Sequence, residues 1–206
     1  MKVIYETDFP ITDEACAAAT GKSIQEWFAV LDAFGGPSKG RRALGNHLYA
    51  DLKVDIWWVQ TLNGQYEIHH GIREKDGRLK GYCICSTKTI AAPLDLVYAA
   101  WTTTERLDSW FSEGSTGAVE EGSEFSNADG NRGVYKRVRE NKDIRFEWRA
   151  ETGDLSIVDV AFSDKGKGKT GVLVTHDRIQ SREEADGVRR AWAEALTRLK
   201  ALAEAA

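Results

Sequence analysis

His176 is the polar residue whose position in the sequence most favours a role in chemistry. It follows Val172 and Val174 at intervals of two, so in a β-strand its side chain lies on the same face as theirs. If that is the inner face, the imidazole lies at the edge of a pocket, where it could orient a ligand or transfer a proton. The alternative is a histidine at the end of a strand that is solvated or hydrogen-bonded to the backbone.

Aromatic residues elsewhere in the same half of the chain could form the wall of a lipophilic pocket, which needs large apolar side chains and few polar groups. We predict that the ligand-binding residues are Trp110, Phe111, Phe125, Phe146, Trp148, Val174, His176 and Trp192. Val160 and Phe162 are expected to complete the wall. The alternative for each aromatic residue is ordinary core packing. No Ser-His-acid set, metal cluster or nucleotide loop is recognisable, so we predict no catalytic residue.

The three cysteines have no spacing that suggests a disulfide framework, which indicates thiols in a reducing compartment. Cys83 and Cys85 would share one face of a strand. A metal site would need two more ligands, and the nearest candidates, His69 and His70, are adjacent in sequence and therefore diverge. We expect neither a metal nor a cofactor, and we interpret the cysteines as buried structural thiols.

Gly21-Lys22-Ser23 matches the end of a phosphate-binding loop. That motif also requires a glycine at the position of Cys16 and a preceding strand, whereas the residues before Gly21 have a helical pattern. We therefore expect the end of one helix followed by the N-cap of the next.

The composition, with 42% hydrophobic and 29% charged residues among 206, is typical of a globular protein. The net charge is −4 and the charges are interspersed, so nucleic acid is a poor candidate partner. No apolar run approaches the roughly 18 residues needed to cross a bilayer. The N-terminus becomes acidic at once, which argues against a secretory signal. These observations predict a cytoplasmic protein without membrane insertion.

The first third of the chain has the periodicity of short helices separated by turns. The expected helices lie at about 12–19, 23–34, 39–52 and 54–66. Their short connections predict a small antiparallel bundle. Trp57 and Trp58 would face about 100° apart on a helix. We expect them at an interface between this bundle and the rest of the chain, with an exposed partner-binding site as the alternative.

From residue 82 the pattern changes to strands interrupted by two helical segments. Tyr82–Ile90 is rich in β-branched and aromatic residues, and Pro93 suits the start of a helix over 94–102. A second helical turn is expected at 105–110. Further strands are expected at 124–126, 133–139, 144–149, 155–162 and 170–179. Apolar and charged residues alternate strictly in 144–149, so one face of that strand is buried and the other is wet.

A long amphipathic helix closes the chain. Ser181 and Glu184 have the spacing of a capping box, and Val188, Trp192 and Leu196 begin one apolar stripe. Such a stripe must pack on an apolar surface, and the sheet offers one. We predict an α+β protein with a helical domain at 1–76 and a helix-grip domain at 77–206, in which a curved antiparallel sheet wraps around the C-terminal helix.

The run Lys88–Thr102 and the segment Leu107–Phe111 resemble the opening of SRPBCC (START/Bet v 1-like) domains, in particular the branch named after the activator of the heat-shock protein 90 ATPase. The resemblance extends over about 81–206 and implies the helix-grip fold. It leaves the function open, because this superfamily includes lipid carriers, receptors, cyclases and co-chaperones. Part of the N-terminal region, 20–27 and 57–71, resembles a small helical domain of unknown function.

These features predict a binder of a small lipophilic molecule, held in a cavity between the sheet and the final helix. Such a cavity is expected because one helix does not fill the concavity of the sheet. The resemblance also implies an alternative, a co-chaperone-like module that binds a chaperone or another protein. A cyclase or hydrolase that uses the cavity is a further alternative. The oligomeric state is left open.

Overall fold

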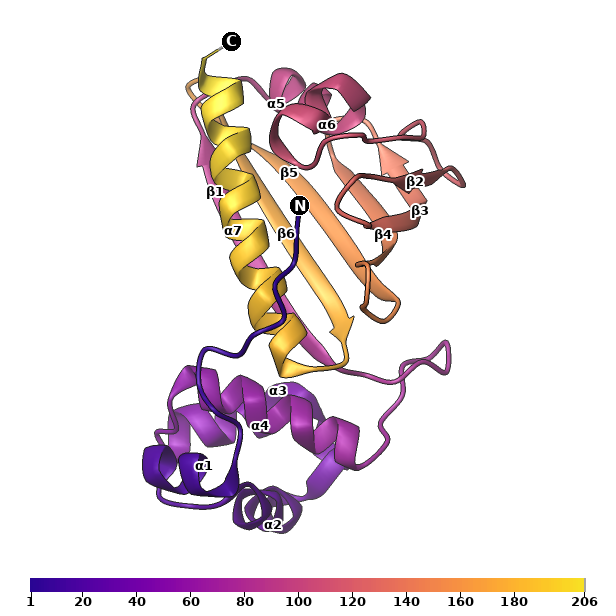
Figure 1. The fold of residues 1–206 in the computed structure, drawn as a ribbon. Helices are drawn as coiled ribbons and strands as arrows, with labels where there is room; N and C mark the ends of the chain where they lie inside the picture. The colour runs from indigo at the N-terminus through magenta and orange to yellow at the C-terminus, as the bar shows by residue number, and fades with distance from the viewer. Residues whose placement is uncertain (206) are drawn as a thin grey trace. The chain divides into compact units, whose positions relative to one another are not determined.

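The computed structural model describes residues 1–205 and divides them into two compact units (Figure 1). The helical unit consists of residues 7–82 and 180–183, and the sheet unit consists of residues 1–6, 83–179 and 184 onward. The mixture of helices with one antiparallel sheet confirms the α+β class. The predicted limits of two folding domains, 1–76 and 77–206, stay a prediction.

The helical unit is built from short helices. They are α1 (Asp13–Thr20), α2 (Ile24–Phe34), the 3₁₀ turn η1 (Gly36–Lys39), α3 (Gly40–Asn46), the π turn η2 (His47–Asp51) and α4 (Ile56–His69). The helix predicted at about 39–52 is observed as α3 continuing directly into η2. The difference is in its last turn, which a hydrogen bond from Leu52 N to His47 O widens into a π turn. The α4 helix begins at Ile56 because the Asp55 side chain caps Trp57 N at 2.9 Å.

The connection between α1 and α2 confirms the predicted helix end and helix cap. Gly21 has φ +83°, a left-handed conformation that suits glycine, and its N–H donates to Ala17 O. Ser23 accepts a hydrogen bond from Glu26 N, and the Glu26 carboxylate accepts one from Ser23 N in return. These contacts use the backbone donors that a phosphate loop would direct at its ligand.

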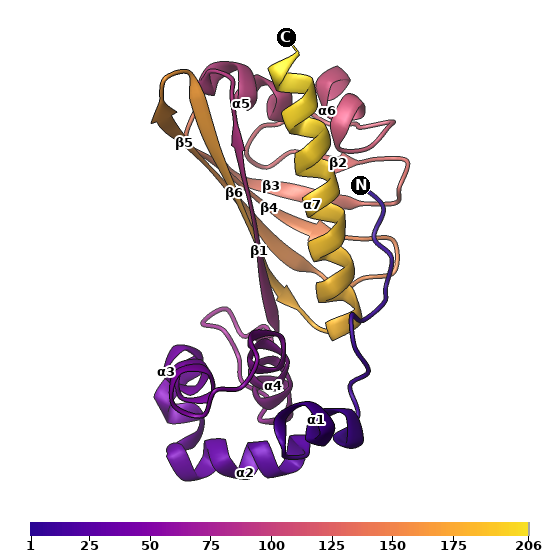
Figure 2. The ribbon, with the colours of Figure 1, turned by 90° about the vertical axis from the view of Figure 1, so that its left-hand side faces the viewer.

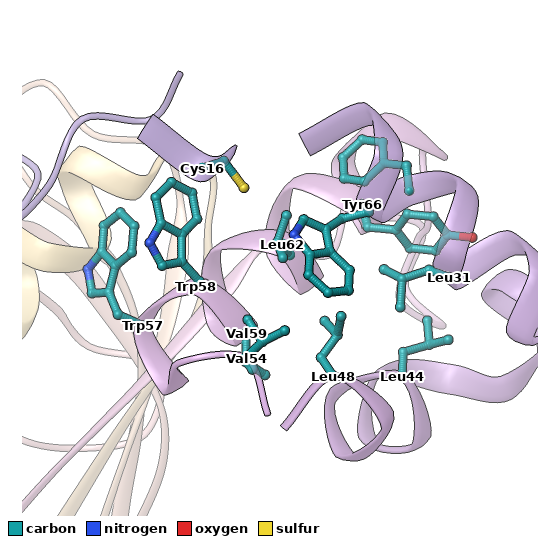
Figure 3. Close-up of a cluster of buried hydrophobic side chains, with 12 residues drawn as sticks. Cys16, Leu31, Leu44, Leu48, Val54, Trp57, Trp58, Val59, Leu62 and Tyr66 are labelled. Carbon is teal, nitrogen blue, oxygen red and sulfur yellow. The ribbon is translucent and has the colours of Figure 1, made fainter. Parts of the chain in front are cut away.

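The core of the helical unit is a cluster of buried apolar side chains (Figure 3). Leu62 lies in its middle, with Trp57 and Trp58 at one end and Leu31 and Tyr66 at the other. Trp57 and Trp58 are both buried and contact each other edge to face, with ring centroids 4.9 Å apart. The alternative of an exposed partner-binding site at these tryptophans is therefore wrong.

The sheet unit contains six strands in the order β1-β6-β5-β4-β3-β2. The strands are β1 (Tyr82–Ile90), β2 (Glu124–Ser126), β3 (Arg132–Arg139), β4 (Asp143–Arg149), β5 (Ser156–Gly166) and β6 (Lys169–Ile179). Helices α5 (Leu94–Thr102) and α6 (Thr104–Trp110) connect β1 to the remaining strands and lie at one end of the sheet (Figure 1). The bounds of β1 and α5 agree with the predicted ranges.

Helix α7 (Arg182–Glu204) runs along one face of the sheet, as the predicted helix-grip arrangement requires (Figure 2). Its apolar stripe is buried, and Val188, Trp192 and Leu199 are each 0% exposed. Residues 1–6 lie beside α7, where Arg190 Nη2 donates to Glu6 O at 2.7 Å. Among residues 1–205, no helix is long and apolar enough to span a bilayer.

Candidate functional site

The strand register places a row of large side chains on the inner face of the sheet. Tyr135 of β3 lies opposite Phe146 of β4, Phe146 lies opposite Val158 of β5, and Val158 lies opposite His176 of β6. All four residues are buried. The alternation predicted for β4 is confirmed, because Ile144, Phe146 and Trp148 are all inside. The sheet therefore supplies the wall from which a pocket could be built.

A small cavity remains where α5 and α6 cover β2, β3 and β4. Five aromatic residues line it: Trp101, Phe111, Phe125, Tyr135 and Phe146. Four polar residues, called the polar rim here, also line it: Ser115, Thr116, Ser126 and Asn127. The cavity volume is about 20 Å³. On this measure about 10–15 Å³ is enough for one water molecule. The cavity thus combines an aromatic wall with a polar rim and is narrow.

Three of the eight predicted ligand-binding residues, Phe111, Phe125 and Phe146, line this cavity. Trp110 does not, because it is buried behind the cavity and its Nε1 donates to Ala100 O at 2.9 Å. Trp148, Val174, His176 and Trp192 belong to the packed core between sheet and helix. The structure therefore brings the eight residues into one interior, while their role in ligand binding stays a prediction.

Trp101 is the cavity residue of most chemical interest. It is 4% exposed, and its Nε1 is a buried donor without a hydrogen-bond partner among residues 1–205. Its ring stacks on Trp192 at 6.0 Å and lies edge to face with Phe162 at 5.8 Å, so packing holds its position. Leaving such a donor unpaired costs on the order of 1–3 kcal/mol.

Trp101, Leu107, Tyr135 and Ile144 were not identified from the sequence as lining residues. Trp101 follows Val97 by four positions, so the helical periodicity of α5 predicts its burial but not its contact with a cavity. Tyr135 has the parity of an inner-face residue in β3, a signal that could have found it. No pattern marks the polar rim, because Ser115 and Thr116 lie in an irregular loop.

That loop, residues 111–123, is called the α6–β2 loop here. Thr116 N donates to Ser126 O at 2.9 Å, and Ser115 N donates to Asp108 Oδ1 at 2.7 Å. Gly117 has φ +87°, and a Cβ atom added there would lie 2.0 Å from Glu124 O. The loop is therefore positioned against β2 by a few backbone contacts and one close approach that only glycine allows.

His176 is fully buried and bonded to side chains. Its Nε2 lies 2.7 Å from Ser156 Oγ, and Trp192 Nε1 donates to its Nδ1 at 3.1 Å. Burial lowers the pKa of His176 to about 3, so the ring is neutral at physiological pH. The predicted alternative of a solvated or backbone-bonded histidine is wrong. The pairing with Trp192 and Ser156 occupies both ring nitrogens and leaves neither available to a ligand.

The cysteines differ from one another in exposure. Cys16 is buried, Cys83 is half-buried and Cys85 is exposed. The interpretation of all three as buried structural thiols is therefore wrong, because Cys83 and Cys85 lie on the outer face of β1, opposite the buried Ile84. Among residues 1–205, no group of three or more His, Cys, Asp or Glu side chains is placed to hold a metal ion.

One known protein family matches most of the sheet unit. The family described as Activator of Hsp90 ATPase homolog 1-like protein matches residues 91–204, which is more than half of the chain. The chain belongs to this family. Every residue that lines the cavity lies within the matched region. No curated protein sequence matches the chain.

Solved structures share the fold of this Activator of Hsp90 ATPase homolog 1-like chain. CalU16 from Micromonospora echinospora is 25% identical with a TM-score of 0.54, over 59% of this chain and 75% of that one. An HSP90 activator from Plasmodium falciparum is 17% identical with a TM-score of 0.55, over 59% and 96% of the two chains. The Aha1 dimer of Colwellia psychrerythraea is 21% identical with a TM-score of 0.53, over 59% and 96%.

The family match begins after β1, so residues 7–82 of the helical unit lie outside it. The similarity of 20–27 and 57–71 to a small helical domain of unknown function stays a prediction. Membership of the Activator of Hsp90 ATPase homolog 1-like family thus accounts for the sheet and its closing helix. It does not identify the molecule that the fold binds.

Proposed function

We propose that the sheet unit binds a small, flat and mainly apolar molecule that carries a hydrogen-bond acceptor. The observation that supports this is the cavity lined by five aromatic residues. One of them, Trp101, has a buried indole N–H without a partner among residues 1–205. Aromatic walls favour apolar ring systems. The buried donor selects, among such molecules, those with a carbonyl, ether or carboxylate oxygen.

The ligand must widen the cavity, since a volume of about 20 Å³ is far below the 300 Å³ or more of ordinary ligand pockets. The α6–β2 loop is the wall that we expect to yield, and the hydrogen bonds of Ser115 and Thr116 to Asp108, Ser112 and Ser126 must then break. Burial of apolar ligand surface, at roughly 25 cal/mol per Å², offsets the loss of those bonds. When the loop moves, the rim hydroxyls that now bond to Ser112 and Ser126 are released to a polar edge of the ligand.

The test uses a small aromatic ketone, acetophenone, titrated into the full chain by isothermal calorimetry. The proposal predicts saturable binding at one site. Leu107 lines the cavity from α6, so Leu107→Phe should fill the space and weaken binding at least tenfold. Leu173 is exposed on the outer face of β6, and Leu173→Phe is the matched control that should bind like the wild type. Absence of binding, or equal losses in both variants, would refute the proposal.

Membership of the Activator of Hsp90 ATPase homolog 1-like family favours a second candidate function, binding to a chaperone of the heat-shock protein 90 class. A cytoplasmic location, suggested by the three thiols, is compatible with either function. The second candidate predicts a raised ATPase rate when the full chain is added to such a chaperone. An unchanged rate together with no complex in gel filtration would remove it.

A further inference from the structure

Cys83 and Cys85 lie two residues apart on β1, an end strand of the sheet. Residues at this spacing project from the same face of a strand. The neighbouring strand β6 contributes Thr175 and Asp177 near them, and Cys85 Sγ lies 3.9 Å from Thr175 Oγ1. Cys85 is exposed, so reagents in solution can reach its sulfur.

The two thiols also contact each other. A hydrogen bond with Cys83 is the main cause that lowers the pKa of Cys85 to about 6, and Thr175 acts in the same direction. Partial burial and the carboxylate of Asp177 act in the opposite direction and are outweighed. Cys85 is therefore largely a thiolate at neutral pH, and the thiolate is the nucleophilic form of cysteine.

We propose that Cys83 and Cys85 form a redox-reactive dithiol on the outer face of the sheet, which a hydroperoxide converts into an intramolecular disulfide. The Cys85 thiolate attacks the peroxide, an S–O bond forms as the O–O bond breaks, and the leaving oxygen takes a proton to become water or an alcohol. Cys85 is then a sulfenic acid. Cys83 loses its proton and attacks the Cys85 sulfur, so that an S–S bond forms and the hydroxyl leaves as water. The two sulfurs supply both electrons that reduce the peroxide.

Formation of this bond requires β1 to leave its extended conformation locally. Two same-face strand residues separated by one are about 6.6 Å apart at both their Cα and their Cβ atoms, within the 4.4–6.8 Å Cα range of disulfides but beyond their Cβ separation of about 3.5–4.5 Å. Because β1 pairs along one side only, with β6, it can bend at Ile84 without breaking a second ladder. Cys83 is also the first residue of the sheet unit after the helical unit. The dithiol thus lies in the strand that follows the covalent connection between the units.

Cys16 provides an internal contrast. It is 0% exposed, its Sγ lies 3.6 Å from Thr20 Oγ1, and burial raises its pKa. A buried thiol of this kind reacts slowly with peroxide. We therefore expect Cys83 and Cys85 to react with peroxide and Cys16 to remain unmodified.

The experiment exposes the reduced full chain to hydrogen peroxide and follows the intact mass. We expect the wild type and Cys16→Ser to lose two hydrogens while they remain single chains on a non-reducing gel. Cys85→Ser should abolish the reaction. Cys83→Ser should stop at the sulfenic acid of Cys85, which dimedone traps. The proposal is overturned if the wild type does not lose two hydrogens, if the product is a disulfide-linked dimer, or if Cys83→Ser gives no dimedone adduct.

Discussion

Trp192 Nε1 donates a hydrogen bond to His176 Nδ1 at 3.1 Å, inside the core between α7 and the sheet. Because an indole N–H can only donate, Nδ1 must be the acceptor and the imidazole proton must reside on Nε2. Nε2 then donates to Ser156 Oγ at 2.7 Å, and Ser156 Oγ donates to Trp148 O at 2.9 Å. These hydrogen bonds define the tautomer of His176. They link Trp192, His176, Ser156 and the Trp148 carbonyl in one chain.

His176 should make the protein sensitive to moderate acid. Burial depresses its folded-state pKa to about 3, whereas the unfolded chain takes up a proton as the pH falls through 6.5. The contribution of His176 to stability is complete above pH 6.5 and falls by about 1.4 kcal/mol per pH unit below it, until the folded state is also protonated near pH 3. Urea unfolding at pH 7 and at pH 4.5 measures the difference.

The matched variant for this effect is His176→Gln, whose amide can accept and donate hydrogen bonds but does not titrate. It should be less stable than the wild type at pH 7 and should lose less stability on acidification. If both proteins lose the same free energy of unfolding between these two pH values, His176 is not the group responsible.

Trp192→Phe should destabilise the protein more than Trp148→Phe. Both substitutions remove similar indole volume from fully buried sites. Trp192 loses a hydrogen bond and leaves His176 Nδ1 unpaired, whereas Trp148 Nε1 has no partner among residues 1–205. The difference should be about 1–3 kcal/mol in the free energy of unfolding, measured by chemical denaturation. Equal losses would indicate that the bond to His176 adds no net stability.

Gly117→Ala should be more damaging than Gly122→Ala. Both glycines lie in the α6–β2 loop with φ near +90°, so both substitutions carry the strain of a left-handed alanine, about 1 kcal/mol. Only at Gly117 would the new Cβ meet a backbone atom, Glu124 O at 2.0 Å. An additional loss of about 1–3 kcal/mol is expected from this overlap. Thermal unfolding of the two variants measures this difference, and equal melting temperatures would contradict it.

The elements of the sheet unit could be predicted from the sequence where local chemistry is strong. Pro93 marks the start of α5, and the alternation of β4 determines which side chains face inward. The π turn η2 could not be foreseen, because Lys39–Leu52 keeps a helical pattern and the widened turn arises from the bond between Leu52 and His47.

The candidate site was predictable only in its aromatic half. Phe111, Phe125 and Phe146 were identified because they are large and aromatic, and of the three only Phe146 lies in a strand with a clear alternation. The polar rim comes from a loop whose path depends on contacts such as Thr116 with Ser126, which no local pattern encodes. Whether an aromatic residue is core or cavity wall depends on packing from several elements, so the sequence indicated Trp110 as a lining residue, whereas the structure has Trp101 there.

The central claim, that the cavity receives an aromatic ligand with an acceptor, is tested most directly at the indole N–H of Trp101. Its nuclear magnetic resonance signal, assigned by Trp101→Phe, would be followed during titration with acetophenone and with α-methylstyrene, in which a methylene group replaces the carbonyl oxygen. We predict that acetophenone shifts this signal and binds about threefold to tenfold more tightly, as one hydrogen bond allows. Equal affinities, or no change at Trp101 with acetophenone, would contradict the account.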